Sequence, residues 1–140
     1  MIAPETDRTA PCAPDTKGRT GPILIVEDEA DLRNTYERIL RRLNLEVIAV
    51  ERAADGLHVA ESRPIRLVLT DLRLPDMDGI ALIRALRACA DPPPIIVASG
   101  LDSGATRRAA LEAGAIAYLT KPFSVATLTA TIQQVLSDGR

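Results

Sequence analysis

The sequence predicts an α/β fold built around a doubly wound, parallel β-sheet. From residue 22 onward, short apolar runs alternate with longer stretches whose apolar residues recur at helical spacing, and no internal repeat is visible. Apolar residues make up 46% of the chain and aromatic residues 2%, so the core must consist largely of Val, Ile, Leu and Ala. Such a core suits a parallel sheet covered by helices on both faces. With 140 residues, one domain of ordinary size is expected.

Five apolar runs are predicted to be strands, because they are short and mostly rich in β-branched residues. They cover residues 23–26, 47–50, 67–69, 95–98 and 116–119. Strands that are buried on both faces show this near-continuous apolar pattern instead of an alternation of apolar and polar residues. The runs therefore predict five strands of one parallel sheet.

Helices are predicted between and after these strands, where apolar residues recur every three or four positions. The first, third and fifth helices have clear apolar stripes, formed by Leu32, Tyr36, Ile39, Leu40 and Leu43, by Ile80, Ile83 and Leu86, and by Leu128, Ile132, Val135 and Leu136. The second helix, around residues 53–61, has the weakest pattern. Its predicted stripe consists of Ala54, Leu57 and Ala60 alone.

Residues at the expected helix ends support this division of the chain. Ser103 and Ser124 occupy N-cap positions of the fourth and fifth helices, and Gly114 follows the fourth helix. Five successive βα units joined by right-handed crossovers form an open sheet with helices on both faces. The flavodoxin-like strand order 2-1-3-4-5 is the common arrangement of such a (βα)5 chain, and we predict it here.

The first 21 residues differ from the rest in composition. Residues 1–21 contain Pro, Thr and Asp with few apolar residues, so we predict a flexible tail followed by a folded domain at residues 22–138. The net charge of −2, without a long basic run, argues against direct nucleic-acid binding. No membrane span or secretory signal is visible, so we expect a cytoplasmic protein. Cys12 and Cys89 are expected to be reduced thiols.

Polar residues follow four of the predicted strands, at the edge of the sheet where open α/β folds bind ligands. Glu27 and Asp28 follow the first strand, Asp71 the third, Ser99 the fourth and Lys121 the fifth. Because the strand order reverses between strands one and three, we expect these side chains to converge on one crevice. Taken singly, each acid or hydroxyl could simply belong to a helix N-terminus or an ordinary turn. Their convergence is what indicates a site.

Lys121 is the least ordinary member of this group. Of the 17 basic residues in the chain, only Lys17 and Lys121 are lysines, and Lys17 lies in the predicted tail. A position that required positive charge alone would be expected to hold Arg here. The sequence therefore indicates a need for a compact, rotatable ammonium group at residue 121.

Such a group of residues has a definite chemistry. Two or three carboxylates within about 4 Å repel one another by a few kcal/mol in a partly exposed site, so they require a cation or protons. Oxygen ligands with open water positions suit Mg2+, for which Mn2+ could substitute. An Asp carboxylate beside such an ion is a known class of phosphoryl acceptor, and Lys121 and the Ser99 hydroxyl could donate to the phosphoryl oxygens.

Four segments carry these residues: ILIVEDE at 23–29, LVLTDLRLPDMDG at 67–79, IIVASG at 95–100 and AYLTKPF at 117–123. In this order and spacing they resemble the receiver family of response regulators, which act in two-component signalling. The resemblance covers about residues 22–138. It implies a phospho-accepting switch that catalyses only its own phosphorylation and dephosphorylation.

The resemblance also implies a role for the acidic residues. Asp71 would be the phosphorylation site, Asp28 would bind Mg2+ directly and Glu27 would help through water. The backbone carbonyl of Arg73 would complete the protein ligands. Glu27 stands where the family more commonly has Asp, which lengthens that side chain. Arg73 and Leu101 occupy positions that govern how fast the aspartyl phosphate is hydrolysed in the family, so the lifetime of the signal is left open.

Further roles follow from the resemblance for the switch. Lys121 would pair with Asp71 before phosphorylation and with the phosphoryl group afterwards. Ser99 and Tyr118 would be switch residues, the ring of Tyr118 turning inward when the Ser99 hydroxyl moves. The peptide bond between Lys121 and Pro122 is expected to be cis.

The implied partners are a phosphoryl donor and a target. The donor would be a sensor histidine kinase or a histidine phosphotransfer protein. The signal would pass through the face of helix four, strand five and helix five to a downstream target protein or an effector domain. A homodimer through this face, with ion pairs from Arg107 and Arg108, is a further hypothesis.

Two other functions fit the sequence less well. An Asp-nucleophile phosphohydrolase is disfavoured because Arg73 stands where a second Asp would act as acid and base, and because no cap insertion is visible. A flavodoxin-like cofactor binder is disfavoured because no phosphate-binding loop follows the first strand and aromatic residues are scarce. The cognate kinase, the output and the full extent of the protein are left open.

Overall fold

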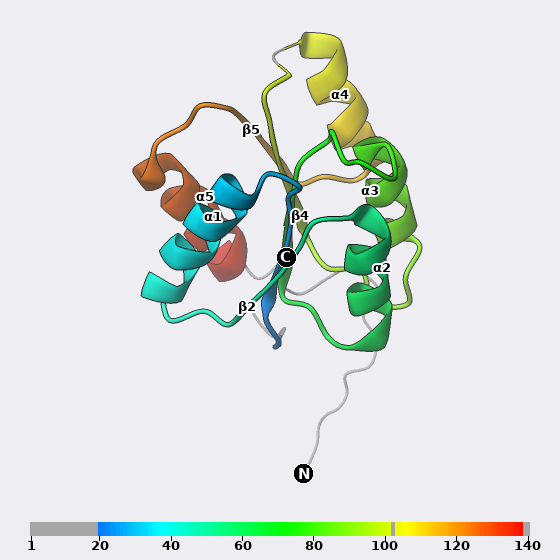
Figure 1. Ribbon diagram of the computed structural model, residues 1–140. Coiled ribbons are helices and arrows are strands. Elements are labelled where there is room, and N and C mark those ends of the chain that lie inside the picture. Colours follow the sequence, from blue (N-terminus) through cyan, green and yellow to red (C-terminus); the bar gives the residue numbers. More distant parts are fainter. Residues whose placement is uncertain (1–19, 102, 139–140) are drawn as a thin grey trace.

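A computed structural model describes residues 20–101 and 103–138 as three layers, with a sheet between two layers of helices (Figure 1). The five strands are parallel and lie in the order β2-β1-β3-β4-β5, so the predicted flavodoxin-like order is confirmed. The strands are β1 (Ile23–Val26), β2 (Val47–Val50), β3 (Leu67–Thr70), β4 (Ile95–Ser99) and β5 (Ala117–Thr120). The helices are α1 (Ala30–Arg42), α2 (Ala53–Ser62), α3 (Gly79–Arg87), α4 (Gly104–Ala113) and α5 (Val125–Asp138).

The predicted strand positions agree with the structure to within one residue. β1 and β2 have the predicted bounds, whereas β3 and β4 each continue one residue further, to Thr70 and Ser99. Both of these polar residues pair in register with a neighbouring strand. β5 begins and ends one residue later than predicted, because Ile116 is 44% exposed and precedes the ladder. The extension of β3 places Asp71 directly at the end of that strand.

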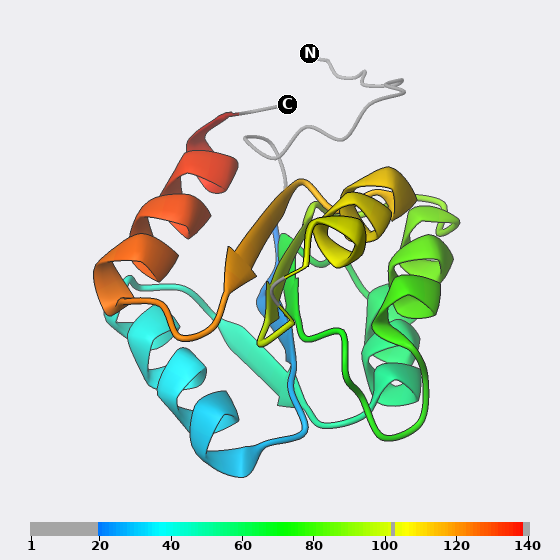
Figure 2. The same cartoon turned by 90° about the horizontal axis from the view of Figure 1, so that it is seen from above.

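Helices cover both faces of the sheet, which explains the continuous apolar pattern of the strands. Leu24 and Val26 pack in the core shared with α2, α3 and α4, whereas Ile23 and Ile25 pack in the core shared with α1 and α5. Figure 2 shows α1 and α5 on one side of the sheet and the other three helices on the opposite side. All four residues of β1 are 0% exposed, and the acids Glu27 and Asp28 follow directly after this buried strand.

The prediction for α2 is correct for its position and correct in part for its buried face, because Leu57 and Ala60 pack against the core but Ala54 does not. Ala54 is exposed, and the buried residues of this helix are Ala53 and Gly56. A Cβ atom added at Gly56 would lie 2.8 Å from Val26 Cγ2. Close packing of α2 on β1 therefore depends on small residues, and small residues give little apolar periodicity from which a face can be predicted.

The predicted helix ends are confirmed. Ser103 Oγ and Ser124 Oγ each accept a hydrogen bond from the backbone N–H three residues later. Gly114 ends α4 with a φ of 129°, a conformation that favours glycine. All of the predicted tail except residues 20 and 21 lies outside the described residues. Within the described part of the chain, no helix is long and apolar enough to cross a membrane.

The loop between β3 and α3 is closed tightly at its base. The N–H of Gly79 donates to the carbonyl of Leu72 at 2.9 Å, and Asp78 caps α3 by accepting from the N–H of Ile80 at 3.1 Å. A Cβ atom at Gly79 would overlap Leu72 Cα and would lie 2.9 Å from the carbonyl oxygen of Asp71. This loop can therefore close only around a glycine.

Replacing Gly79 with Ala is expected to lower the free energy of unfolding by about 1–3 kcal/mol, because the loop backbone must move to admit the methyl group. Gly104→Ala is the matched control, since an added Cβ there meets nothing within 4 Å. Urea unfolding measures both variants. Equal loss of stability in the two variants would contradict the tight closure of this loop.

Candidate functional site

Three carboxylates meet at the carboxyl ends of β1 and β3, which are neighbours in the sheet. The N–H of Asp71 donates to the carbonyl of Val26 at 3.2 Å, so the segments that follow the two strands start side by side. One carboxylate oxygen from each of Glu27, Asp28 and Asp71 lies within 4.8 Å of the others. The structure thus brings together the three acids that the strand order predicted would converge.

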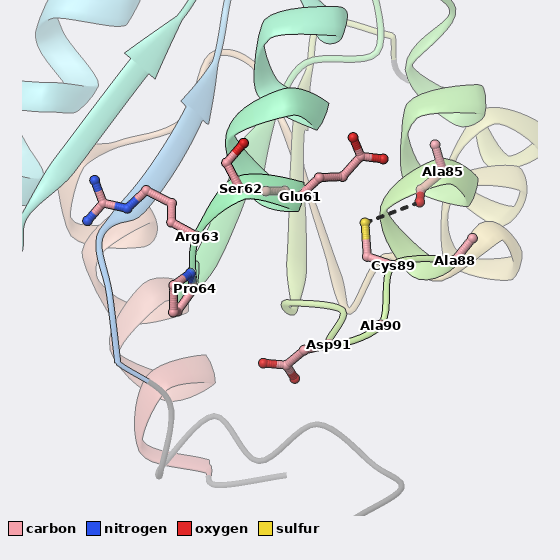
Figure 3. A pocket seen from close by; sticks show the side chains of 10 residues that line it. Glu61, Ser62, Arg63, Pro64, Ala85, Ala88, Cys89, Ala90 and Asp91 are labelled. Carbon is pink, nitrogen blue, oxygen red and sulfur yellow. Dashed lines mark hydrogen bonds between the residues drawn. The ribbon is translucent and has the colours of Figure 1, made fainter.

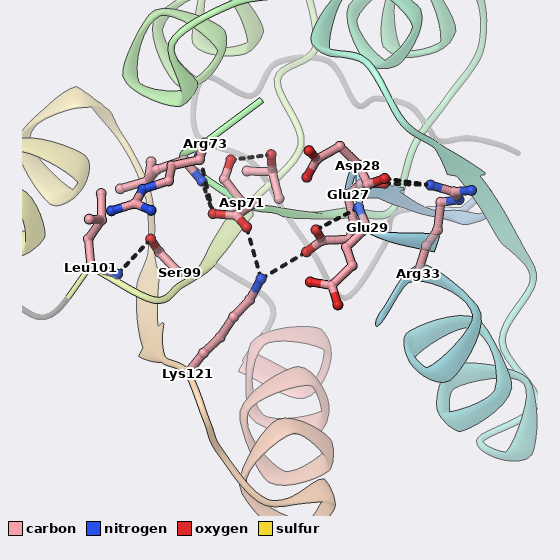
Figure 4. A network of polar contacts seen from close by, with 11 residues as sticks. Glu27, Asp28, Glu29, Arg33, Asp71, Arg73, Ser99, Leu101 and Lys121 are labelled. Carbon is pink, nitrogen blue, oxygen red and sulfur yellow. Dashed lines mark hydrogen bonds and ion pairs between the residues drawn. The ribbon is translucent and has the colours of Figure 1, made fainter. Parts of the chain in front are cut away.

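The ammonium of Lys121 lies between two of these acids (Figure 4). Its Nζ donates to Asp71 Oδ2 at 2.8 Å and to Glu27 Oε1 at 2.9 Å. The backbone N–H of Lys121 donates to the carbonyl of Ser99 at 2.8 Å, which holds the segment after β5 against the end of β4. The peptide bond to Pro122 is cis, as expected. Main chain and side chain together therefore direct this ammonium into the acidic crevice.

Charge and burial shift the pKa values of this group. Burial by itself would lower the pKa of Lys121, but hydrogen bonds to Asp71 and Glu27 and the charges of both carboxylates raise it above its ordinary value. Burial raises the pKa of Glu27, and the contact with Lys121 offsets this only in part. Lys121 therefore remains charged and serves as counterion to the buried carboxylate of Glu27.

The contact between Glu27 and Lys121 was not predicted from the sequence. Glu27 is 2% exposed, and its second oxygen, Oε2, accepts from the N–H of Glu29 at 3.1 Å. Both carboxylate oxygens of Glu27 therefore already have protein donors. The two partners lie 94 positions apart, and no local pattern relates them.

The carboxylates of the two aspartates differ in their surroundings. Asp71 Oδ1 accepts from the N–H of Leu72 at 2.6 Å and from the N–H of Arg73 at 3.2 Å. Asp28 is exposed, and no donor contacts its carboxylate in the described part of the chain. A water-facing carboxylate beside one that is held in place suits a hard divalent cation that keeps several waters. The donor set therefore fits Mg2+.

Arg33 is a site residue that sequence reasoning missed. Its Nη1 donates to the carbonyl of Glu27 at 2.9 Å and lies 3.4 Å from the carbonyl of Asp28. The guanidinium thus supports the backbone of the turn that carries both acids. The sequence offers fifteen arginines, and only the way α1 folds back onto the turn distinguishes this one.

Ser99 and Tyr118 are linked through the backbone of Leu101. Ser99 Oγ accepts from the N–H of Leu101 at 3.1 Å, and the Tyr118 hydroxyl donates to the carbonyl of Leu101 at 2.6 Å. The ring of Tyr118 is 7% exposed, and the guanidinium carbon of Arg107 lies 5.1 Å from its centroid. Tyr118 is therefore buried, and the backbone of the loop after β4 joins it to Ser99.

Comparison with known proteins decides the family. Residues 23–133 match the family model of the response regulator receiver domain. The chain belongs to the response regulator receiver family. Transcriptional regulatory protein PrrA of Mycobacterium tuberculosis is 40% identical over 121 residues, which are 85% of this chain and 52% of that protein. The receiver thus spans about half the length of this relative.

Solved receiver structures have the same fold. The CheY-like receiver domain protein of Methanospirillum hungatei JF-1 has 31% identity and a TM-score of 0.79, over 84% of this chain and 94% of that chain. The receiver domain of sensor histidine kinase PA1611 from Pseudomonas aeruginosa PAO1 has 31% identity and a TM-score of 0.76, over 89% and 98%. That structure contains a magnesium ion coordinated in its active site cleft. The present chain is thus a receiver domain of the two-component type, and a phosphohydrolase is not favoured.

A second hollow of this receiver lies between the C-terminal ends of α2 and α3, away from the acidic crevice (Figure 3). The Cys89 thiol donates to the carbonyl of Ala85 at 3.6 Å. Burial and the nearby charge of Glu61 raise the pKa of this thiol, which keeps it neutral and weakly reactive. Cys89 is a free thiol, as predicted, and Cys12 lies outside the described residues.

Replacing Lys121 with Met in this receiver is expected to lower the free energy of unfolding by about 1–3 kcal/mol at neutral pH without magnesium, because two shielded carboxylates lose their donor. The folded-state pKa of Glu27 is already raised, and loss of the lysine raises it further. The destabilisation is therefore largest above that pKa and shrinks as the pH falls through it and Glu27 takes up a proton. Urea unfolding at about pH 7 and about pH 5 measures the difference.

The control for this variant is Arg41→Met, which removes a surface ion pair with Glu37 on α1. Its effect is expected to stay below about 1 kcal/mol at both pH values. A loss in Lys121→Met that is no larger than the control, or that grows as the pH falls, would contradict the role of the ammonium as counterion.

Proposed function

We propose that Asp71 accepts a phosphoryl group from a phosphorylated histidine of a sensor histidine kinase or a histidine phosphotransfer protein. A carboxylate oxygen of Asp71 forms a bond to phosphorus while the bond from phosphorus to the imidazole nitrogen breaks, and the leaving imidazole takes up a proton from solvent. The observation that carries this proposal is the 2.8 Å contact between Lys121 Nζ and Asp71 Oδ2, beside two further acids. An ammonium at this place can bind the transferred group as well as orient its acceptor.

The proposed reaction requires Mg2+, for which Mn2+ could substitute. Asp28 and Asp71 would bind the ion through their carboxylates, Arg73 through its backbone carbonyl and Glu27 through water. The ion would neutralise charge on the phosphoryl oxygens. Support comes from the open carboxylate of Asp28 and from the 4.8 Å grouping of the three acids.

Lys121 and Ser99 are proposed to respond to the arrival of the phosphoryl group. Lys121 would donate to its oxygens while remaining close to Asp71. For Ser99 to donate its hydroxyl there, it must give up the hydrogen bond from Leu101, whose carbonyl holds the Tyr118 hydroxyl. Phosphorylation would thereby change the loop after β4 and the environment of the Tyr118 ring, beside which Arg107 lies.

The signal is proposed to leave through the face formed by α4, β5 and α5. Leu111 on α4 and Ile116 before β5 are 41% and 44% exposed, and apolar side chains of this kind suit a surface that binds a partner. That partner would be a downstream target protein, an effector domain or a second copy of the chain, with Arg107 and Arg108 available for ion pairs between subunits.

The proposed functional unit is residues 22–138, acting in the cytoplasm without direct contact to nucleic acid or membrane. It would catalyse only its own phosphorylation and dephosphorylation. The small net charge of −2 is consistent with a protein partner in place of a polyanion.

Treatment with acetyl phosphate and Mg2+ is expected to add one phosphoryl group to the wild-type receiver and none to Asp71→Asn, as measured by intact mass spectrometry. Asp55→Asn, which changes an exposed acid on α2, is expected to react like the wild type. Chelation of the metal should abolish the reaction. Equal labelling of wild type and Asp71→Asn would end the proposal.

Replacing Ser99 with Ala is expected to leave Asp71 able to accept phosphate but to uncouple Tyr118 from it. The two tyrosines, Tyr36 and Tyr118, permit a direct test by labelling with fluorotyrosine and recording fluorine NMR. Beryllofluoride, a phosphoryl mimic, should shift the Tyr118 signal in the wild type and much less in Ser99→Ala. Identical shifts in both proteins would contradict the proposed coupling.

A further inference from the structure

Asp76 lies at the tip of the loop that joins β3 to α3, and its carboxylate reaches across to a different helix. Asp76 Oδ1 accepts from the N–H of Ala53 at 2.9 Å, and Asp76 Oδ2 accepts from the N–H of Ala54 at 2.9 Å. These are the first two residues of α2. The carboxylate therefore binds the N-terminus of α2 from a loop that is 22 to 23 positions away in the sequence.

This contact replaces the usual local cap of the helix. The N-cap residue of α2 is Arg52, whose side chain makes no capping hydrogen bond. Side chains such as Ser, Asp or Asn normally accept from the first free N–H groups of a helix, and a negative charge there is favoured by the helix dipole. The hydrogen bonds from the N–H groups of Ala54 and Ala53 lower the pKa of Asp76, and the bond from Ala54 has the larger effect. The bound form of Asp76 is therefore the carboxylate. The helix depends on the loop for its cap, and the loop depends on the helix for its position.

The loop held in this way is the one that carries the acceptor. Its base is closed by the hydrogen bond from Gly79 to Leu72 and by a backbone bridge between Arg73 and Asp78. Near the base, the N–H groups of Leu72 and Arg73 fix one oxygen of Asp71. Asp76 adds a second anchor at the tip, on a helix that packs against β1 and lies beside α3 (Figures 1 and 2). The loop is thereby fixed at its base by its own backbone and at its tip by α2.

We infer that Asp76 is a positioning residue for phosphoryl transfer, which holds the loop so that the Arg73 carbonyl and the Asp71 carboxylate keep their places around a divalent cation. Asp76 itself touches neither the cation nor the phosphoryl group. This inference rests on the proposed function of Asp71. It extends the site to a contact between α2 and the acceptor loop that lies outside the acidic crevice.

The test separates positioning from simple helix capping. Asp76→Ala removes both hydrogen bonds. Adding Arg52→Ser in the same chain supplies a hydroxyl at the N-cap position, where the backbone is extended (φ −123°, ψ 147°) as N-cap residues require. The double variant should therefore recover much of the stability of α2 without restoring the tie between α2 and the loop.

Mg2+ affinity by calorimetry, the rate of labelling by acetyl phosphate and urea unfolding are to be measured on wild type and all variants. Asp76→Ala is expected to weaken Mg2+ binding by about tenfold and to slow labelling, as loss of groups that orient metal ligands does. In the double variant, the unfolding midpoint should return toward wild type while Mg2+ affinity and labelling remain impaired. Ser103→Ala, which uncaps α4 only, should leave Mg2+ affinity unchanged.

Each outcome decides the inference. Full recovery of Mg2+ affinity and labelling in the double variant would reduce Asp76 to a helix cap and overturn it, as would wild-type values in Asp76→Ala. If the wild type itself is not labelled on Asp71, the proposed function fails instead, and the calorimetry still reports whether Asp76 supports cation binding.

Discussion

The site depends on one interaction, the placement of the Lys121 ammonium between the carboxylates of Glu27 and Asp71. Neighbouring strands that both end in acids bring like charges to one edge of the sheet, where they repel at close range. A single ammonium that donates to one oxygen of each acid offsets this repulsion. It also allows Glu27 to be 2% exposed, which an unpaired carboxylate would not tolerate.

Sheet topology supplies the rest of the arrangement. Because β1 lies beside β3, the acids that follow both strands meet, and β4 and β5 complete the same edge with Ser99 and Lys121. Backbone groups then hold the side chains in place: two N–H groups fix an oxygen of Asp71, and the N–H of Leu101 holds the Ser99 hydroxyl. The main chain thus holds the carboxylate of Asp71 rigidly. The Ser99 hydroxyl is held only by the loop after β4 and can move with that loop.

The sequence predicts the strands, their order and the convergence of the acids on Lys121, because each of these follows from local pattern and from the rules of parallel sheets. It does not predict contacts that depend on how helices and loops fold back. The capping of α2 by Asp76, the support of the acidic turn by Arg33 and the second bond of Lys121 to Glu27 are all of this kind. On α2, Leu57 and Ala60 pack against the core as predicted, but Ala53 and Gly56 were missed because such small residues carry almost no periodic signal.

Calorimetric titration with MgCl2 shows whether the acids that follow β1 and β3 share one divalent cation beside Lys121. The wild-type chain is expected to bind a single ion, and Asp28→Asn, which removes the open carboxylate, is expected to lose affinity by about tenfold or more. Unchanged affinity in Asp28→Asn, or no binding by the wild type, would contradict a shared cation site.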